Sequence, residues 1–130
     1  MPKKAEDGKI ISDLGRAKKD KARDKDVAAE LKRLKALFSS LPENERKFLQ
    51  PLFENAAFMK ITLDTLQAEI REKGTVESYQ NGERQSGFKI SAAVQAYNQT
   101  IKNYNAVMDK LIDRLPAEEK KSDSLSQFRL

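Results

Sequence analysis

A strict spacing of apolar residues in the last third of the chain limits its possible folds more than any other feature. The apolar residues recur at alternating steps of three and four positions: Val94, Tyr97, Ile101, Tyr104, Met108, Leu111 and Leu115. Because an α-helix turns every 3.6 residues, this spacing puts all of these side chains on one helical face. We predict a helix over residues 91–114, with Ser91 as its N-cap and Pro116 as its stop.

A second apolar stripe occupies the middle of the chain. It comprises Leu49, Leu52, Ala56, Met59, Leu63, Leu66 and Ile70, again at steps of three and four. The spacing predicts a long helix over residues 41–73, followed by Gly74 in a left-handed conformation. Ser40 and Glu43 have the spacing of a capping box at its start. Pro51 should kink or split this helix.

A shorter stripe precedes both long helices. Val27, Leu31, Leu34, Phe38 and Leu41 predict a helix over residues 26–39. We therefore expect an all-α fold, in which this helix covers part of a long antiparallel helical hairpin. Two rods do not hide a broad apolar stripe from water, so we expect self-association. The seam of the core and oligomer is predicted to comprise Leu52, Met59, Leu63, Leu66, Ile70, Val94, Tyr97, Ile101, Tyr104, Met108, Leu111 and Leu115.

The segment between the two long helices has a different character. Residues 75–79 favour an extended backbone, Asn81-Gly82 is typical of a type I′ turn, and residues 87–90 can return as a second strand. We predict a small β-hairpin here. An isolated hairpin is only marginally stable in water, so it should pack on the helices or on a neighbouring subunit.

The net charge lies entirely at the N-terminal end. Residues 1–26 contain nine Lys or Arg and six Asp or Glu, whereas residues 42–130 are balanced, so the first 41 residues carry the whole net charge of +5. Residues 1–25 have few large apolar side chains, which favours a flexible basic arm. We divide the chain into this arm, a helical oligomerisation core over residues 26–116, and a polar tail over residues 117–130.

A one-sided basic arm suits nucleic acid or an acidic protein surface. The candidate DNA-binding residues are Lys3, Lys4, Lys9, Arg16, Lys18, Lys19, Lys21, Arg23, Lys25, Lys32, Arg33 and Lys35. The alternative is that this mixed-sign segment serves only solubility. The tail contains Leu125, Phe128 and Leu130. These three either dock weakly or bind a partner, or the tail is simply disordered.

The composition argues against an enzyme. The chain has no Cys and no His, which removes thiol nucleophiles, the commonest general base and the commonest transition-metal ligand. It has no phosphate-binding glycine loop, and its carboxylate pairs suit solvated helix faces better than acid–base chemistry. We predict no catalytic residue, no metal site and no cofactor. No apolar run approaches the ~20 residues that cross a bilayer, so we expect no membrane partner.

Several segments between about residues 27 and 120 form a pattern that is similar to a known family. They include Asn55-Ala-Ala-Phe-Met59, Thr62-Leu63, Leu66, Glu77 through Gly82, Ala96-Tyr97-Asn98, Ile101-Lys102-Asn103-Tyr104 and Leu111 through Pro116. With these residues the chain resembles the small terminase subunits of tailed phages, in particular a short all-helical group.

The resemblance implies a DNA-recognition subunit of a genome-packaging motor. Such proteins form homo-oligomeric rings around a helical-hairpin core, bind double-stranded viral DNA and engage the large terminase subunit, which carries the ATPase and nuclease. It also implies a location in the cytoplasm of the bacterial host cell. Two alternatives stay open: a coiled-coil scaffold or adaptor that binds only proteins, and a helical protein that binds RNA.

Overall fold

The computed structural model describes residues 2–80, 82–83 and 85–120. This part of the chain is mostly helical, with one small antiparallel sheet of two strands, as the sequence predicts. The elements are α1 (Pro2–Leu37), α2 (Glu43–Lys73), β1 (Val76–Gln80), β2 (Ser86–Ile90), α3 (Ala92–Ile112) and the single turn α4 (Ala117–Lys120).

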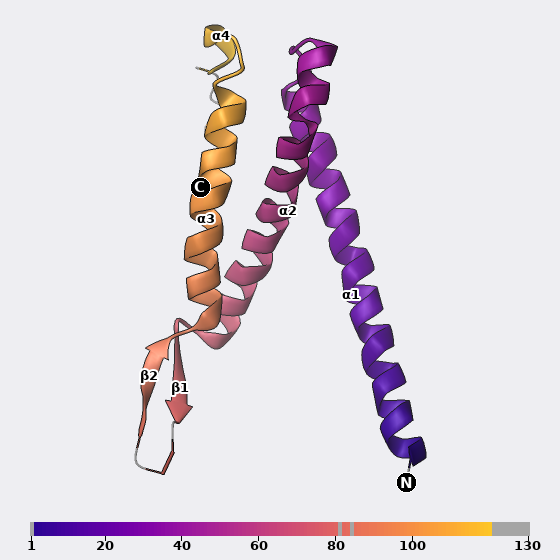
Figure 1. The fold of residues 1–130 in the computed structure, drawn as a ribbon, viewed down its shortest axis with the longest axis vertical. Coiled ribbons are helices and arrows are strands. Elements are labelled where there is room, and N and C mark those ends of the chain that lie inside the picture. The colour runs from indigo at the N-terminus through magenta and orange to yellow at the C-terminus, as the bar shows by residue number, and fades with distance from the viewer. Residues whose placement is uncertain (1, 81, 84, 121–130) are drawn as a thin grey trace.

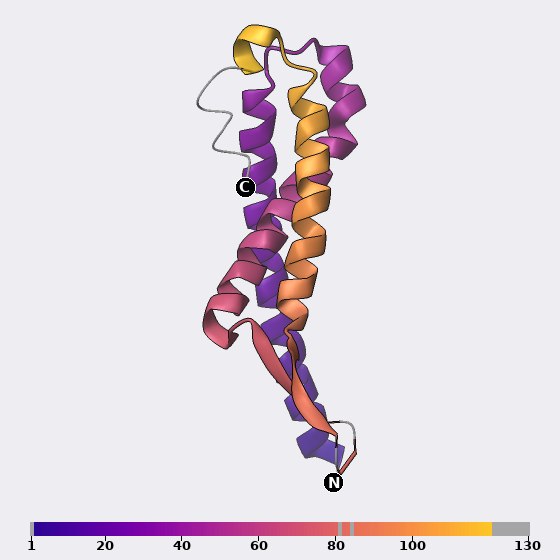
Figure 2. The same cartoon turned by 90° about the vertical axis from the view of Figure 1, so that its left-hand side faces the viewer.

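The three long helices form an elongated body that is open at one end. α2 and α3 lie side by side and run in opposite directions, and the β-hairpin that joins them projects beyond the end of α2 (Figures 1 and 2). The C-terminal half of α1 packs on α2, whereas its N-terminal half stands away from the other helices (Figure 1). α4 lies at the end opposite to the β-hairpin.

The prediction of a short first helix over residues 26–39 is wrong, because the helix also includes the described residues of the predicted arm. α1 begins at Pro2 and continues to Leu37, so it is longer than α2. Proline is favoured at the first position of a helix, and no other proline occurs before Pro42. Once the packed turns near Leu34 have nucleated the helix, each added residue gains a hydrogen bond, and the Lys, Arg and Ala residues of the arm extend it readily.

The start of α2 differs from the predicted capping box. α2 begins at Glu43 and has Pro42 as its N-cap, without a capping side chain. Ser40 therefore lies outside the helix, and its hydroxyl donates instead to Glu119 Oε2 of α4 at 2.8 Å. α2 also continues through Pro51 without a break, although Figure 2 shows that its axis changes direction after the first turns.

Gly74 ends α2 with φ 87° and ψ −179°. Its positive φ was expected, but the pair of angles belongs to an extended region that is essentially restricted to glycine. The backbone N–H of Gly74 donates to Ile70 O at 2.7 Å, and β1 starts two residues later. Gly74 thus lets the chain leave the helix directly into the hairpin.

α3 begins as predicted. The Ser91 hydroxyl accepts a hydrogen bond from the backbone N–H of Val94 at 3.2 Å. The backbone N–H of Ser91 donates to Thr75 O at 2.9 Å, which closes the base of the hairpin. α3 ends at Ile112, slightly before the predicted residue 114, and the polar tail begins with the helical turn of α4. Leu125, Phe128 and Leu130 lie outside the described residues.

The β-hairpin forms without the predicted tight turn. Val76 pairs with Ile90 and Gln80 pairs with Ser86, which leaves a connection of five residues where a type I′ turn needs two. Asn81 itself lies outside the described residues. Side-chain pairs favour the observed register. It places Glu77 opposite Lys89, with Lys89 Nζ 3.5 Å from Glu77 Oε1. It also brings the Tyr79 ring onto Gly87, so that a Cβ atom added to Gly87 would lie only 3.1 Å from the ring.

The core lies at the end of the body where α1 covers the other two helices. Its buried members are Leu34, Phe38, Leu41, Leu49, Phe53, Ala56, Ala57, Leu63, Tyr104, Met108, Leu111, Ile112 and Leu115. Of the predicted seam, Leu52, Met59, Tyr97 and Ile101 pack against this core and are half-buried. Leu66, Ile70 and Val94 are also half-buried but do not belong to it. These three lie near the hairpin, where α1 has diverged and no longer covers α2 and α3.

Candidate nucleic-acid interface

Four lysines of α1 share one helical face. Lys18, Lys21, Lys25 and Lys32 follow one another at steps of three, four and seven residues, so they align along the helix. All four are exposed, and they lie opposite the buried Leu34. The acidic residues of this stretch occupy other positions of the helical repeat: Asp20, Asp24, Asp26 and Glu30. We call the four lysines the lysine face; it extends over about 21 Å of the helix.

Arg23 lies on the other side of α1 and contacts α2. Its Nη2 donates to Thr62 Oγ1 at 2.6 Å, and its guanidinium lies 4.7 Å from the centre of the Phe58 ring. Residues 17–22, which precede it, are all exposed. Arg23 therefore attaches α1 to α2 at the point where the two helices separate. This intramolecular role competes with the DNA contact that the sequence suggests for Arg23.

Arg33 is also engaged inside the protein. Its Nε and Nη2 donate to both carboxylate oxygens of Glu30, at 2.9 and 2.6 Å. Glu30 is almost fully buried and lies near Tyr104 of α3, which is completely buried. Burial first, and then the negative charge of Glu30, raise the pKa of Tyr104 to about 12. The ion pair with Glu30 holds the half-exposed Arg33 side chain away from the lysine face.

The other candidate DNA-binding residues have separate positions. Lys3, Lys4, Lys9 and Arg16 belong to α1, but their side chains lie outside the described part. Lys19 is exposed, one residue off the lysine face, and so points in another direction. Lys35 is exposed three residues beyond Lys32 and lines a pocket between α1 and α2. The structure thus brings together the four lysines and Lys35, and separates them from Arg23 and Arg33.

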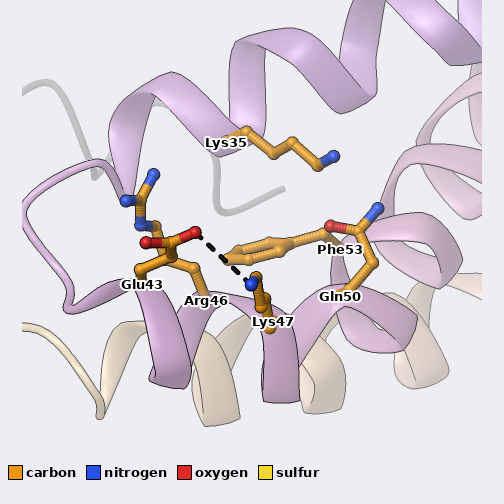
Figure 3. A pocket seen from close by; sticks show the side chains of 6 residues that line it. All are labelled: Lys35, Glu43, Arg46, Lys47, Gln50 and Phe53. Carbon is orange, nitrogen blue, oxygen red and sulfur yellow. Dashed lines mark ion pairs between the residues drawn. The ribbon is translucent and has the colours of Figure 1, made fainter.

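The pocket between α1 and α2 combines cations with an aromatic floor (Figure 3). Its volume is about 240 Å³, and it is lined by Lys35, Glu43, Arg46, Lys47, Gln50 and Phe53. Lys47 Nζ and Glu43 Oε1 form an ion pair of 3.4 Å, and both side chains are largely exposed. Lys35 reaches over the pocket from α1, and Phe53 lies between the two helices (Figure 3).

Sequence reasoning missed Arg46 and Lys47 because Glu43 and Glu45 cancel their charge along the chain. The fold separates these charges. Glu45 forms an ion pair with Arg114 at the end of α3, at 3.5 Å, and Glu43 pairs with Lys47. The sequence does contain one indication that these cations lie near the basic residues of α1. The connection at Pro42 is short, and a short connection brings the end of α1 close to the first turns of α2.

The β-hairpin carries an exposed apolar face. Val76, Phe88 and Ile90 point to the same side of the two strands, and more than half of each side chain is exposed. Phe88 is the most exposed of them, at 79%. Phe48, at the start of α2, is also 76% exposed. Such side chains are typical of surfaces that contact another protein.

The described residues were also compared with the requirements of a metal site and of a membrane-spanning helix. In the described part of the chain, no group of three or more Asp or Glu side chains is placed to hold a metal ion. Among the same residues, no helix has the length and apolar character needed to span a bilayer.

Comparisons with known proteins add no family to these observations. No protein-family model matches the chain, and searches of curated proteins and of solved structures found no match.

Proposed function

We propose that this protein is a DNA-binding subunit without enzymatic activity, of the small-terminase type, which recognises viral DNA and regulates a large ATPase and nuclease subunit. The observation that carries the proposal is the lysine face of α1. Lys18, Lys21, Lys25 and Lys32 present a row of exposed cations without an acidic residue among them. A row of cations suits the regular negative charges of a DNA backbone, and their binding releases condensed counterions.

The position of α1 supports this role. The N-terminal half of α1 stands away from α2 and α3 (Figure 1). In the packed half of α1, the lysine face lies opposite the buried Leu34 and so points away from the body, where a duplex can approach it. These lysines contact phosphates in this proposal and carry no sequence information by themselves. Recognition of a particular viral site then requires further contacts, from the first turns of α1 or from several subunits together.

Assembly into a homo-oligomeric ring is the second part of the proposal. The α2–α3 helical hairpin is the repeating unit, because Leu66, Ile70 and Val94 remain half-buried along it and the apolar face of the β-hairpin is exposed. In a closed ring each subunit buries the same two patches against its neighbours. The large terminase subunit and the cytoplasm of a bacterial host complete the proposed context.

The test is the salt dependence of binding to a labelled 30-base-pair duplex, measured by fluorescence anisotropy. Replacing Lys18, Lys21, Lys25 and Lys32 by Gln removes four phosphate contacts. The slope of log K against log salt should therefore fall by about 3.6 for each chain that contacts the DNA. A control variant loses four lysines elsewhere: Lys73, Lys89, Lys102 and Lys110, each replaced by Gln. Equal slopes for the two variants would show that the lysine face does not contact the DNA.

A protein-binding scaffold is the second candidate function. The exposed apolar face of the β-hairpin favours it, because Val76, Phe88 and Ile90 together suit a protein surface better than a phosphate backbone. Wild-type protein that forms oligomers but shows no salt-sensitive binding to duplex DNA would support the scaffold and exclude the DNA-binding role. Stronger binding to folded RNA than to duplex DNA would favour an RNA-binding protein instead.

A further inference from the structure

We propose that the pocket between α1 and α2 binds one phosphate group of the DNA backbone and so extends the lysine face from α1 onto α2. The inference rests on the proposed DNA-binding function. It adds Arg46 and Lys47 to the interface, two residues in a segment whose net charge along the sequence is close to zero.

The charge of the pocket is the first argument. Lys35, Arg46 and Lys47 supply three cations, and Glu43 is the single carboxylate among the residues that line it. The Glu43–Lys47 pair is 3.4 Å long and about three-quarters exposed on both sides, so it contributes little and a stronger anion can displace it. Glu45 is held toward Arg114, just after the end of α3. The pocket therefore keeps an excess of positive charge.

An unpaired donor is the second argument. The Nε atom of Arg46 is buried and has no hydrogen-bond partner among the described residues. A buried polar group without a partner is rare and costly, and a guanidinium is always charged and donates only. A phosphate reaches this atom only if the Arg46 side chain turns into the pocket that it lines, and the planar fork of the guanidinium then matches the oxygens of the phosphate group.

The size and floor of the pocket narrow the class of ligand. Its volume of about 240 Å³ is below the ~300–1,000 Å³ typical of small-molecule sites, so it suits a single group better than a whole nucleotide. Phe53 is 1% exposed and packs on the Phe38 ring, with ring centres 5.4 Å apart. This fixed apolar floor keeps the ligand at the rim with the cations and leaves no open ring for a base to stack on.

Continuity with the lysine face identifies the source of the phosphate. Lys35 lines the pocket and follows Lys32 by three residues, hence by about one helical turn. A single backbone that runs along Lys25 and Lys32 can thus continue to Lys35 at the pocket. An acidic protein segment would satisfy the same cations, and the experiment below separates the two.

The first measurement repeats the anisotropy assay with Arg46→Gln/Lys47→Gln, and with Lys102→Gln/Lys110→Gln as the control that loses the same charge on α3. Loss of one phosphate contact should lower the salt slope by about 0.9 for each bound chain, and the control should keep the wild-type slope. Circular dichroism checks that both variants fold. A slope equal to that of the control would refute phosphate binding in the pocket, without affecting the DNA-binding role of the lysine face. Wild-type protein that does not bind duplex DNA overturns both.

The second measurement observes Arg46 directly. The Nε–Hε signal of Arg46 in the full chain is followed by NMR during titration with a 5′-phosphorylated thymidine dinucleotide. We expect a saturable shift of this signal, with no shift of the exposed Arg71 on α2. Loss of the shift in Lys47→Gln would agree with a shared ligand. A shift with tetraglutamate but none with the dinucleotide would assign the pocket to acidic proteins and refute the proposal.

Discussion

The Tyr104 cluster makes the stability of this protein depend on pH in the alkaline range. The side chain is completely buried in α3, and burial together with the charge of Glu30 raises its pKa from 10.0 to about 12. In the unfolded chain the hydroxyl loses its proton first, so the unfolded state binds fewer protons between pH 10 and 12. The contribution of Tyr104 is therefore complete below pH 10 and is lost as the pH rises toward 12.

The size of the effect follows from the shift. A difference of about two pKa units corresponds to roughly 2.7 kcal/mol, because one unit is worth about 1.36 kcal/mol. Urea unfolding, followed by circular dichroism at several pH values from 8 to 12, gives the free energy of unfolding. We compare wild type with Tyr104→Phe, which keeps the ring and removes the hydroxyl. The two proteins differ only in the hydroxyl of residue 104, so the contribution of all other groups cancels in the difference.

Wild type should lose about 2–3 kcal/mol more than Tyr104→Phe between pH 9 and pH 12. Glu30→Gln should reduce this loss, since its negative charge is the second cause of the raised pKa. A difference between wild type and Tyr104→Phe that stays constant with pH would refute the reasoning. It would mean that the Tyr104 hydroxyl reaches water in the folded protein and that α1 does not cover α3 as the structure has it.

Three further predictions test the core, the assembly and the absence of catalysis. Phe38→Ala should lower the free energy of unfolding by about 3–5 kcal/mol, because Phe38 is fully buried. Phe48→Ala, at a residue that is 76% exposed, should change it by about 0.5 kcal/mol or less. Equal losses of the two variants in urea unfolding would show that Phe48 is buried in an assembly. Asn103→Glu, at an exposed position of α3, should dissociate the oligomer and keep its helicity, as measured by native mass spectrometry and circular dichroism; an unchanged mass would place Asn103 in solvent. The purified chain should not hydrolyse ATP, and turnover without a large-subunit partner would contradict the proposed role.

The helices were predictable because apolar spacing is a local signal. The stripes that start at Val94 and at Leu49 lie on α3 and α2, although α3 ends at Ile112, before Leu115. The Ser91 cap formed as its position predicted. The same spacing does not tell how much of a stripe is covered. Leu111 is fully buried and Val94 is only half-buried, since coverage depends on where α1 diverges from the other helices.

The candidate site was predictable only as a region of charge. The count of charges placed the net positive charge in the first 41 positions, but the partners of those basic residues can lie far away in sequence. Arg23 contacts Thr62, 39 residues later, and no local pattern reveals that contact. Arg46 and Lys47 were hidden for the opposite reason, because their carboxylate neighbours cancel them in a count along the chain. The helical state of the arm was missed because its low hydrophobicity was given more weight than the absence of proline between Pro2 and Pro42.

The part of α1 before Arg23 has the geometry of a lever, because Arg23 is where it is attached to α2. The 21 residues from Pro2 to residue 22 extend about 30 Å from that attachment at about 1.5 Å per residue. A swing of only about 10° at the pivot then displaces the tip by roughly 5 Å, whereas the lysine nearest to Arg23 hardly moves. With such a swing, residues near Arg23 would keep their place relative to the body, whereas residues at the N-terminal end of α1 would move through the solvent. A ring of such levers would search a wide annulus for its ligand while each base stayed in register with its neighbours.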